Sequence, residues 1–248
     1  MELIPIRLRA LRAPQDTLRD ALLSASLKLK EGDIVAISSK VVSIDEGNTV
    51  PVEGTDKDRL VEQEADWYLK FEKAKYRHRF TIAKGAMAGS AGIDQSNGNG
   101  YYILYPKDPM KSARQLRAWI QKTYGVKKIA VLITDSTSIP MRRGAIGFAL
   151  AWDGFVPLKD YRHKKDIFGR EFKVEVANIA DGLAAGAVVA MGEGNEQTPI
   201  AIIRGANIEF GNRKTKEPLV TASPKDDLFA PILFTQRWKR GRSGRSRN

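Results

Sequence analysis

The 248 residues of this chain suffice for one large domain or two small ones, and the 42% hydrophobic content is ordinary for a soluble globular protein. The absence of cysteine excludes disulfide bonds, thiolate metal sites and cysteine nucleophiles. The charged start predicts no secretory leader, and no apolar run is long enough to span a bilayer, so we expect a cytoplasmic protein that makes no membrane contact. The net charge of +12 suits anionic ligands.

The positive charge is concentrated at the C-terminus. Residues 237–248 contain six basic and no acidic residues, which leaves +6 on the first 236 residues. This stretch is rich in Gly, Ser and Arg, a composition typical of a disordered basic arm. Such an arm could bind nucleic acid or could simply increase solubility. We therefore expect a folded domain over residues 1–236 and a basic, disordered tail over residues 237–248.

Apolar runs and helical periodicity divide the first half of the chain into short elements. We predict strands over four segments, Ile4–Leu8, Ile34–Ser38, Phe80–Ile82 and Tyr101–Tyr105. We predict helices over Asp16–Leu29, with Asp16 as the N-cap and Gly32 just past its end, and over Arg59–Tyr76. Glycine and small polar residues crowd the segment 83–100, which predicts a loop.

The second half continues in the same irregular order. We predict helices over Pro109–Tyr124 and Ala177–Met191, strands over Ile129–Thr134 and Pro199–Ile203, an apolar segment over Ala145–Trp152, and a turn at Asp166–Arg170. We find no internal repeat and no interdomain linker. Strands and helices that interleave irregularly indicate a single mixed α/β or α+β domain.

Polar residues at the ends of apolar elements indicate a metal site. Asp135 and Ser136 follow the strand that ends at Thr134, and ligands tend to bind outside the carboxyl ends of strands. Asp94 and Glu193 lie in two other glycine-rich polar clusters. Carboxylate and hydroxyl oxygens suit Mg²⁺ or Mn²⁺. Each carboxylate could equally be an ordinary loop residue that caps a turn.

A magnesium site of this kind indicates a nucleotide, because Mg²⁺ is usually held by one or two carboxylates together with substrate phosphates. No complete phosphate-binding motif is present, since GxxxxGK[ST] is missing and GEGNEQ at 192–197 does not complete GxGxxG. Lys40, Arg142 and Arg143 are candidates to neutralise phosphate or carboxylate oxygens, or they are solvated surface charges. His78 and His163 lie in very polar settings, and we assign neither a catalytic role.

Together these segments resemble the coenzyme F420-0:γ-glutamyl ligase family. The resemblance rests on SSKVVSIDEG (38–47), AGIDQSN (91–97), Asp135–Ser136, KDIFGRE (165–171), ADGLAAGAVVAMGEG (180–194) and PIAIIRG (199–205). It implies an α+β, mixed-sheet single domain that forms an intertwined homodimer with its active site in a cleft. It also implies that the chain joins L-glutamate to the carboxylate of an anionic acceptor through an acyl phosphate, using GTP and Mg²⁺ or Mn²⁺, with K⁺ as a further candidate ion.

The resemblance also implies roles for single residues. It assigns the metal to Asp94, Asp135, Ser136 and Glu193. It assigns the nucleotide to Ser39, Lys40, Asn97, Met191, Gly192, Gly194, Asn195 and Glu196. Arg142 and Arg143 are candidate catalytic residues on charge and position alone.

The chain also departs from the family pattern at three places. The family's DTFGR is DSTSIPMRRG at 135–144, a usual lysine is Ile44, and a usual histidine is Lys84. These departures leave two acceptors open, coenzyme F420-0 and a folate-type molecule. A catalytically idle nucleotide-binding relative and a protein that binds nucleic acid through its tail are the alternatives to an enzyme.

Overall fold

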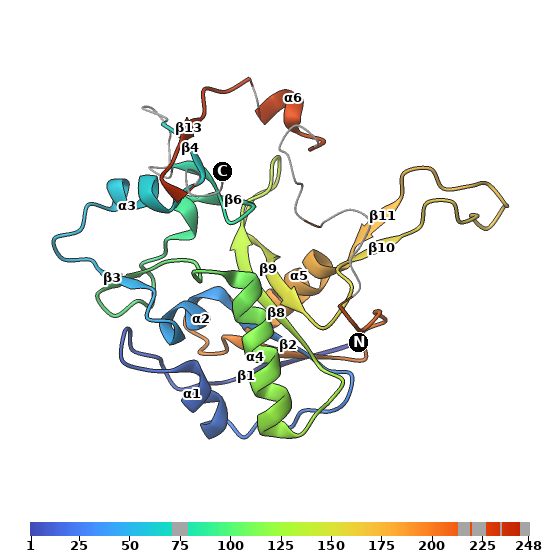
Figure 1. Cartoon of the computed structure of the whole chain (residues 1–248), viewed down its shortest axis with the longest axis horizontal. Coiled ribbons are helices and arrows are strands. Elements are labelled where there is room, and N and C mark those ends of the chain that lie inside the picture. The colour runs from blue at the N-terminus through green and yellow to red at the C-terminus, as the bar shows by residue number, and fades with distance from the viewer. Residues whose placement is uncertain (71–78, 213–218, 220–226, 234, 244–248) are drawn as a thin grey trace.

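A mixed five-stranded sheet forms the centre of the computed structural model, which describes residues 1–70, 79–212, 219, 227–233 and 235–243 (Figure 1). Its order is β1 (Glu2–Ile6), β12 (Ile200–Arg204), β2 (Ile34–Ser38), β8 (Ala130–Thr137) and β9 (Ile146–Asp153). β2 and β8 are parallel, and the other neighbouring pairs are antiparallel. The prediction of a single α+β domain with a mixed sheet is thereby confirmed.

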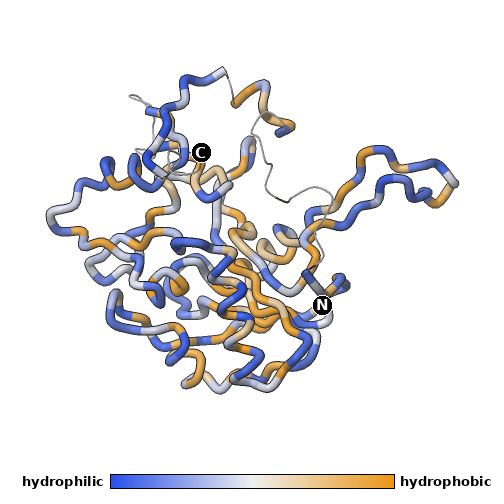
Figure 2. Tube along the Cα trace, viewed as in Figure 1, coloured by the Kyte–Doolittle hydropathy of each residue, from blue (hydrophilic) through white to orange (hydrophobic). Residues whose placement is uncertain are grey.

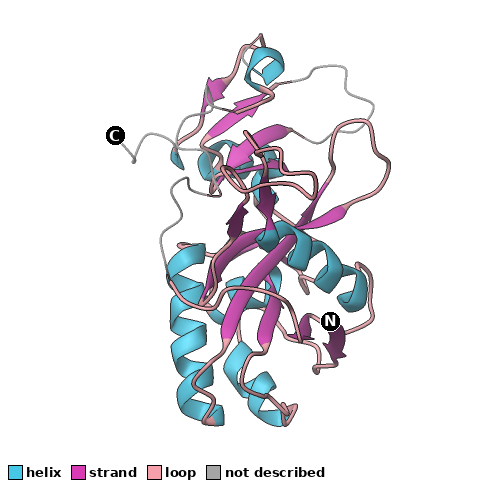
Figure 3. Cartoon of the chain, turned by 90° about the vertical axis from the view of Figure 1, so that its right-hand side faces the viewer, coloured by secondary structure: helices cyan, strands magenta, loops and turns pink. Residues whose placement is uncertain are grey.

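Helices cover both faces of this sheet (Figure 3). On β2, Val35 and Ile37 face the larger core, which also contains residues of α1 (Leu18–Ser24), α2 (Ser39–Asp45) and α4 (Pro109–Tyr124). Ile34 and Ala36 face the opposite way, toward α5 (Ile179–Met191). Strands buried on both faces are continuously apolar rather than alternating. Figure 2 shows this hydrophobic centre along the strands of the sheet.

Smaller elements surround the central sheet. A four-stranded sheet contains, in order, β13 (Lys239–Arg240), β4 (Trp67–Leu69), β5 (Phe80–Ala83) and β6 (Ala86–Gly89). Two two-stranded sheets are formed by β3 (Thr49–Pro51) with β7 (Tyr101–Ile103) and, as a hairpin, by β10 (Leu158–Asp160) with β11 (Val176–Asn178). The remaining elements are the helices α3 (Lys57–Glu64) and α6 (Ala230–Leu233) and a 3₁₀ turn at Ser90–Gly92. In the described part of the chain, no helix has the length and apolar character needed to cross a membrane.

Two predicted helices differ from those observed. α1 begins at Leu18, because the Thr17 side chain, and not that of Asp16, accepts a hydrogen bond from the Asp20 N–H and caps it. The helix predicted over residues 59–76 is wrong beyond Glu64, since the chain becomes extended at Ala65 and residues 67–69 pair with β5 as strand β4. Residues 71–78, including His78, lie outside the described residues.

Two further predicted segments have different bounds in the structure, and the division of the chain at residue 236 stays a prediction. The segment 83–100, expected to be a loop, contains strand β6. The predicted helix 177–191 begins only after strand β11. In the basic tail, Lys239 and Arg240 pair with Tyr68 and Trp67 of β4, and residues 244–248 lie outside the described residues.

β8 is longer than predicted, and this changes the setting of the candidate site. The strand continues to Thr137 because Asp135 and Ser136 pair with Phe148 and Gly147 of β9, after a register shift between Ile133 and Thr134. β9 in turn lies very close to α5, since a Cβ at Gly147 would lie 2.6 Å from Val188 Cγ2. Asp135 therefore belongs to a paired strand and not to a loop.

Candidate active site

A pocket of about 290 Å³ lies at one edge of the central sheet. β1, β2 and β8 run in the same direction, so their carboxyl ends, and the segments that follow them, lie at this same edge. The α5–β12 connection closes the pocket from the side. Most of the wall comes from four segments: 8–11 after β1, Ser38–Ile44 at the end of β2, Thr134–Ser136 on β8, and 191–199 before β12. The site therefore follows the rule that ligands bind outside the carboxyl ends of strands.

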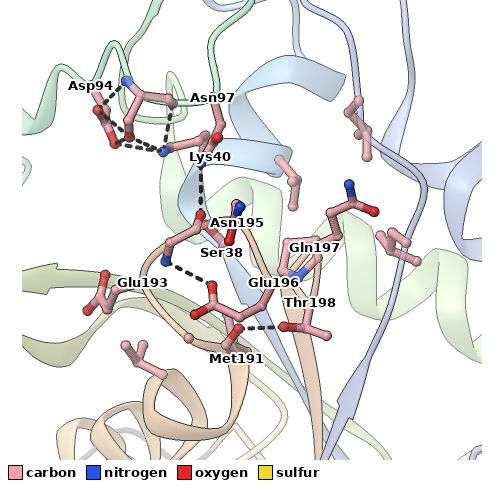
Figure 4. Close-up of a pocket in the computed structure, with 18 of the residues that line it drawn as sticks. Ser38, Lys40, Asp94, Asn97, Met191, Glu193, Asn195, Glu196, Gln197 and Thr198 are labelled. Atoms are coloured by element: carbon pink, nitrogen blue, oxygen red, sulfur yellow. Dashed lines mark hydrogen bonds and ion pairs between the residues drawn. The ribbon is translucent and has the colours of Figure 1, made fainter.

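Lys40 and Asp94 form an ion pair in the pocket wall (Figure 4). Lys40 is in the first turn of α2, and its Nζ lies 2.6 Å from an Asp94 carboxylate oxygen. It also donates to the backbone and side-chain oxygens of Ser96, each at 3.0 Å. Burial opposes ionisation of Asp94, but the bonds from Lys40 and Ser96 outweigh it and hold the pKa of Asp94 below its ordinary value.

Asp135 also lines the pocket, on the part of β8 that pairs with β9. Burial raises the pKa of Asp135 to about 6, and the negative charge of Asp94 adds to this rise. The Tyr105 hydroxyl, the Ser136 N–H and Lys40 act in the opposite direction. Two neighbouring carboxylates therefore have pKa values shifted in opposite directions, a pattern that is common at functional sites.

Ser136 and Glu193 connect β8 to the connection after α5. The Ser136 hydroxyl donates to Glu193 Oε2 at 3.2 Å. The predicted metal ligands Asp94, Asp135, Ser136 and Glu193 thus all line one pocket, although they come from three distant segments of the sequence.

The segment 191–199 is fixed mainly through main-chain atoms. The N–H groups of Leu8 and Ser38 donate to the carbonyl oxygens of Gln197 and Pro199, each at 2.9 Å. The Asn97 side chain donates to Gly194 O at 3.0 Å, which joins the AGIDQSN segment to this loop (Figure 4). Within the loop, the Glu196 carboxylate accepts from the Gly194 N–H at 2.9 Å.

The structure brings most of the predicted nucleotide residues together. Seven of them line the pocket: Lys40, Asn97, Met191, Gly192, Gly194, Asn195 and Glu196. Ser39 is buried in α2 and does not line the pocket. Arg142 and Arg143 lie outside the pocket lining, in the exposed loop between β8 and β9. His163 lies on the hairpin, paired with Glu171.

Two residues that the sequence analysis did not select belong to this region. Arg9 lines the pocket with a side chain that is paired with Asp16 at 2.8 Å. Tyr105 is buried beside Asp135. The basic residues directly after the first strand could have indicated Arg9, had the order of the strands been known.

The donor atoms fit a hard divalent cation. They are all oxygens, and Asp94 lies near enough to Asp135 to raise its pKa, a repulsion that a bound cation relieves. Within the described ranges, no group of three or more His, Asp or Glu side chains is arranged to hold a metal. One or two carboxylates would therefore act together with ligand oxygens, as is usual for Mg²⁺.

A family model and several known proteins resemble most of this chain. Residues 6–205 match the family model described as F420-0:Gamma-glutamyl ligase. The Coenzyme F420:L-glutamate ligase of Methanocaldococcus jannaschii is 36% identical over 222 residues, which cover 84% of this chain and 88% of that protein. The protein of the same name from Methanopyrus kandleri is 34% identical over 250 residues, which cover 91% and 96%. That from Methanococcus maripaludis is 32% identical over 244 residues, which cover 92% and 97%.

Proposed function

Because this chain belongs to the F420-0:gamma-glutamyl ligase family, we propose that it joins L-glutamate to the carboxylate of an F420-type acceptor, with GTP as the co-substrate and a divalent cation in the pocket. The observation that carries the proposal is the convergence of Asp94, Asp135, Ser136 and Glu193 on one pocket that also contains Lys40. The relatives named for this reaction match nearly the whole chain.

The reaction needs activation of a poor electrophile. An acceptor carboxylate oxygen attacks the γ-phosphorus of the nucleotide, the bond to the leaving diphosphate breaks, and an acyl phosphate forms. The glutamate amine then attacks the acyl carbon, loses a proton, and expels inorganic phosphate as the amide forms. Catalysis of such phosphoryl transfer consists mainly of positioning and of stabilising charge.

The residues of the pocket have distinct roles in this proposal. Asp94 and Asp135 would hold the cation together with phosphate oxygens, whose charge the cation would neutralise. Ser136 and Glu193, which are hydrogen-bonded to each other, stay predicted ligands. The ammonium of Lys40 binds phosphate as a point charge. Arg9 presents a second cation to the pocket for a phosphate or a substrate carboxylate. The roles of Arg142 and Arg143 stay predictions, since both lie outside the pocket lining.

The direct test is ligation by the purified full chain with isotopically labelled glutamate, GTP and Mn²⁺. We expect the F420-type acceptor to gain the mass of a glutamyl group, with one phosphate released for each amide formed. A folate-type acceptor belongs in the same experiment, because the 137–144 segment departs from the family pattern. Nucleotide binding without glutamate-dependent phosphate release on either acceptor would favour the idle relative.

We also propose that the protein is a homodimer. The β10–β11 hairpin extends away from the rest of the chain (Figure 1) and carries Ile167, Phe168 and Val174 at 91%, 88% and 85% exposure. Exposed apolar side chains on a projecting arm are typical of an interface. Light scattering on the wild type and on the Ile167→Ser/Phe168→Ser variant tests this, and a monomeric wild type would contradict it.

A further inference from the structure

We infer that Tyr105 is a positioning residue, whose hydroxyl donates a hydrogen bond to Asp135 from beneath the pocket and so orients that carboxylate toward the bound cation. This inference rests on the proposed function, because it takes Asp135 as a metal ligand. Tyr105 does not line the pocket. It acts from behind the wall, through Asp135.

The main chain around Tyr105 is held firmly. Its carbonyl oxygen accepts from Asn48 Nδ2 at 2.7 Å, and the N–H of the preceding Leu104 donates to Asn48 O at 3.2 Å. The side chain is only 3% exposed. The backbone hydrogen bonds and the close packing therefore fix the position of the Tyr105 ring.

The ring of Tyr105 lies directly against Gly92, two residues before Asp94. A Cβ at Gly92 would lie 2.0 Å from Cζ, the ring carbon that bears the hydroxyl, and 2.3 Å and 2.4 Å from Cε1 and Cε2. Only a glycine permits this approach, and Gly92 also has a positive φ of 72°. The AGID segment thus carries Asp94 on the pocket side and makes room for the phenol behind it.

The Tyr105 hydroxyl lacks a conventional partner. Its oxygen is buried, and among the described residues no group meets strict hydrogen-bond geometry with it. A buried hydroxyl without a partner is unfavourable, so such a group calls for an explanation. Asp135 is the charged neighbour with which this hydroxyl interacts. A phenol is a hydrogen-bond donor, and a carboxylate is its natural acceptor.

This arrangement matches how metal-binding carboxylates are usually supported. Such ligands are themselves hydrogen-bonded, and loss of the supporting group typically lowers metal affinity about 10- to 100-fold. A hydrogen bond from the Tyr105 hydroxyl would occupy one carboxylate oxygen of Asp135 and leave the other for the cation.

Mn²⁺ binding to the full chain tests this role without turnover. Free Mn²⁺ is measured by electron paramagnetic resonance, with Mn²⁺ alone and with Mn²⁺ plus GTP, in the absence of acceptor and glutamate. Tyr105→Phe removes the hydroxyl and keeps the ring on Gly92, and we expect its Kd for Mn²⁺ to rise about tenfold. Tyr102→Phe is the matched control, because Tyr102 is also buried, lies on β7, and faces Lys57.

A rescue variant distinguishes hydrogen bonding from packing. Tyr105→4-aminophenylalanine keeps a donor at the same place and should restore the affinity to near the wild-type value. If Tyr105→Phe is folded and binds Mn²⁺ as the wild type does, while Asp135→Asn binds weakly, the role of Tyr105 is refuted and the metal site stands. Should Tyr105→Phe fail to fold, the 4-aminophenylalanine variant decides alone: wild-type affinity supports the role, and affinity as weak as that of Asp135→Asn refutes it. A wild type that binds no Mn²⁺ under either condition refutes both.

Discussion

The Lys40 ammonium lies 2.6 Å from the Asp94 carboxylate and joins the first turn of α2 to the AGIDQSN segment. The two residues are 54 positions apart in the sequence. Their proposed ligands have opposite charges, since Lys40 would bind an anionic phosphate and Asp94 a cation. In the proposed site, a divalent cation would compete with the ammonium for this carboxylate. Binding of metal and nucleotide should therefore be coupled, since a phosphate gives Lys40 a new partner when the metal takes Asp94.

Removing the ammonium should weaken nucleotide binding. For Lys40→Met we expect the KM for GTP to rise roughly tenfold or more, because a charge-assisted bond to phosphate is lost. The thermal midpoint should change little, since a partly exposed ion pair contributes about 0–1 kcal/mol. Lys122→Met on the exposed end of α4 is the control. A GTP KM equal to that of the wild type would show that Lys40 does not bind the nucleotide.

Metal binding should depend on pH through Asp135. Its pKa is raised to about 6, so the protonated, non-ligating form predominates below that pH. We therefore expect Mn²⁺ affinity to be constant at pH 7–8 and to fall as the pH drops through 6, by on the order of tenfold per pH unit. Asp135→Asn should bind weakly and without this step, and it should retain the wild-type circular dichroism. An affinity that is flat from pH 7 to pH 5 would argue against Asp135 as a ligand.

Gly92→Ala should destabilise the protein more than an ordinary substitution of a loop glycine. The new methyl group would lie 2.0 Å from the Tyr105 ring, in addition to the cost of a positive φ. Gly100→Ala is a close control, because Gly100 has a φ of 88° but nothing within 4 Å of a new Cβ. Urea unfolding should give a loss for Gly92→Ala that exceeds the loss for Gly100→Ala by roughly 1–3 kcal/mol. Equal losses would mean that the ring moves aside freely.

Arg9 is expected to contribute to substrate binding. It is a pocket cation outside the Lys40–Asp94 pair, so Arg9→Ala should raise the KM of GTP or of the acceptor about tenfold while kcat changes less. Arg142→Ala and Arg143→Ala belong in the same series, because charge and position alone suggested them. If kcat falls in either of these two variants while Arg9→Ala behaves as the wild type does, the arginine that contributes to the reaction lies in the β8–β9 loop and is not Arg9.

The four metal-site candidates come from local signals in the sequence, and their role as ligands stays a prediction. Asp135 follows a buried apolar run, and Asp94 and Glu193 lie in glycine-rich segments, so each is recognisable locally. Their meeting in one pocket depends on the parallel pairing of β2 with β8 and on the position of β12 beside β2. The family pattern supplied that information, whereas periodicity alone does not.

The errors have a common cause in tertiary pairing. The sequence pattern of Trp67–Leu69 predicts a continuation of helix α3, but in the structure this segment is a strand because it pairs with β5. β8 runs on through Asp135 because β9 binds its polar end. The sequence did not indicate Arg9, because only the strand order brings the end of β1 to the pocket. It did not indicate Tyr105, because a buried tyrosine after a strand has the sequence pattern of any core residue.

The main-chain attachment of the 191–199 segment has an evolutionary consequence. Its bonds from Leu8 and Ser38 reach carbonyl oxygens, which every residue type possesses. The side chains of Asn195 and Gln197, which line the pocket, can therefore be exchanged without displacing the loop. Ligand preference can drift in this way while the scaffold stays constant, so that members of one family can come to use different nucleotides or acceptors.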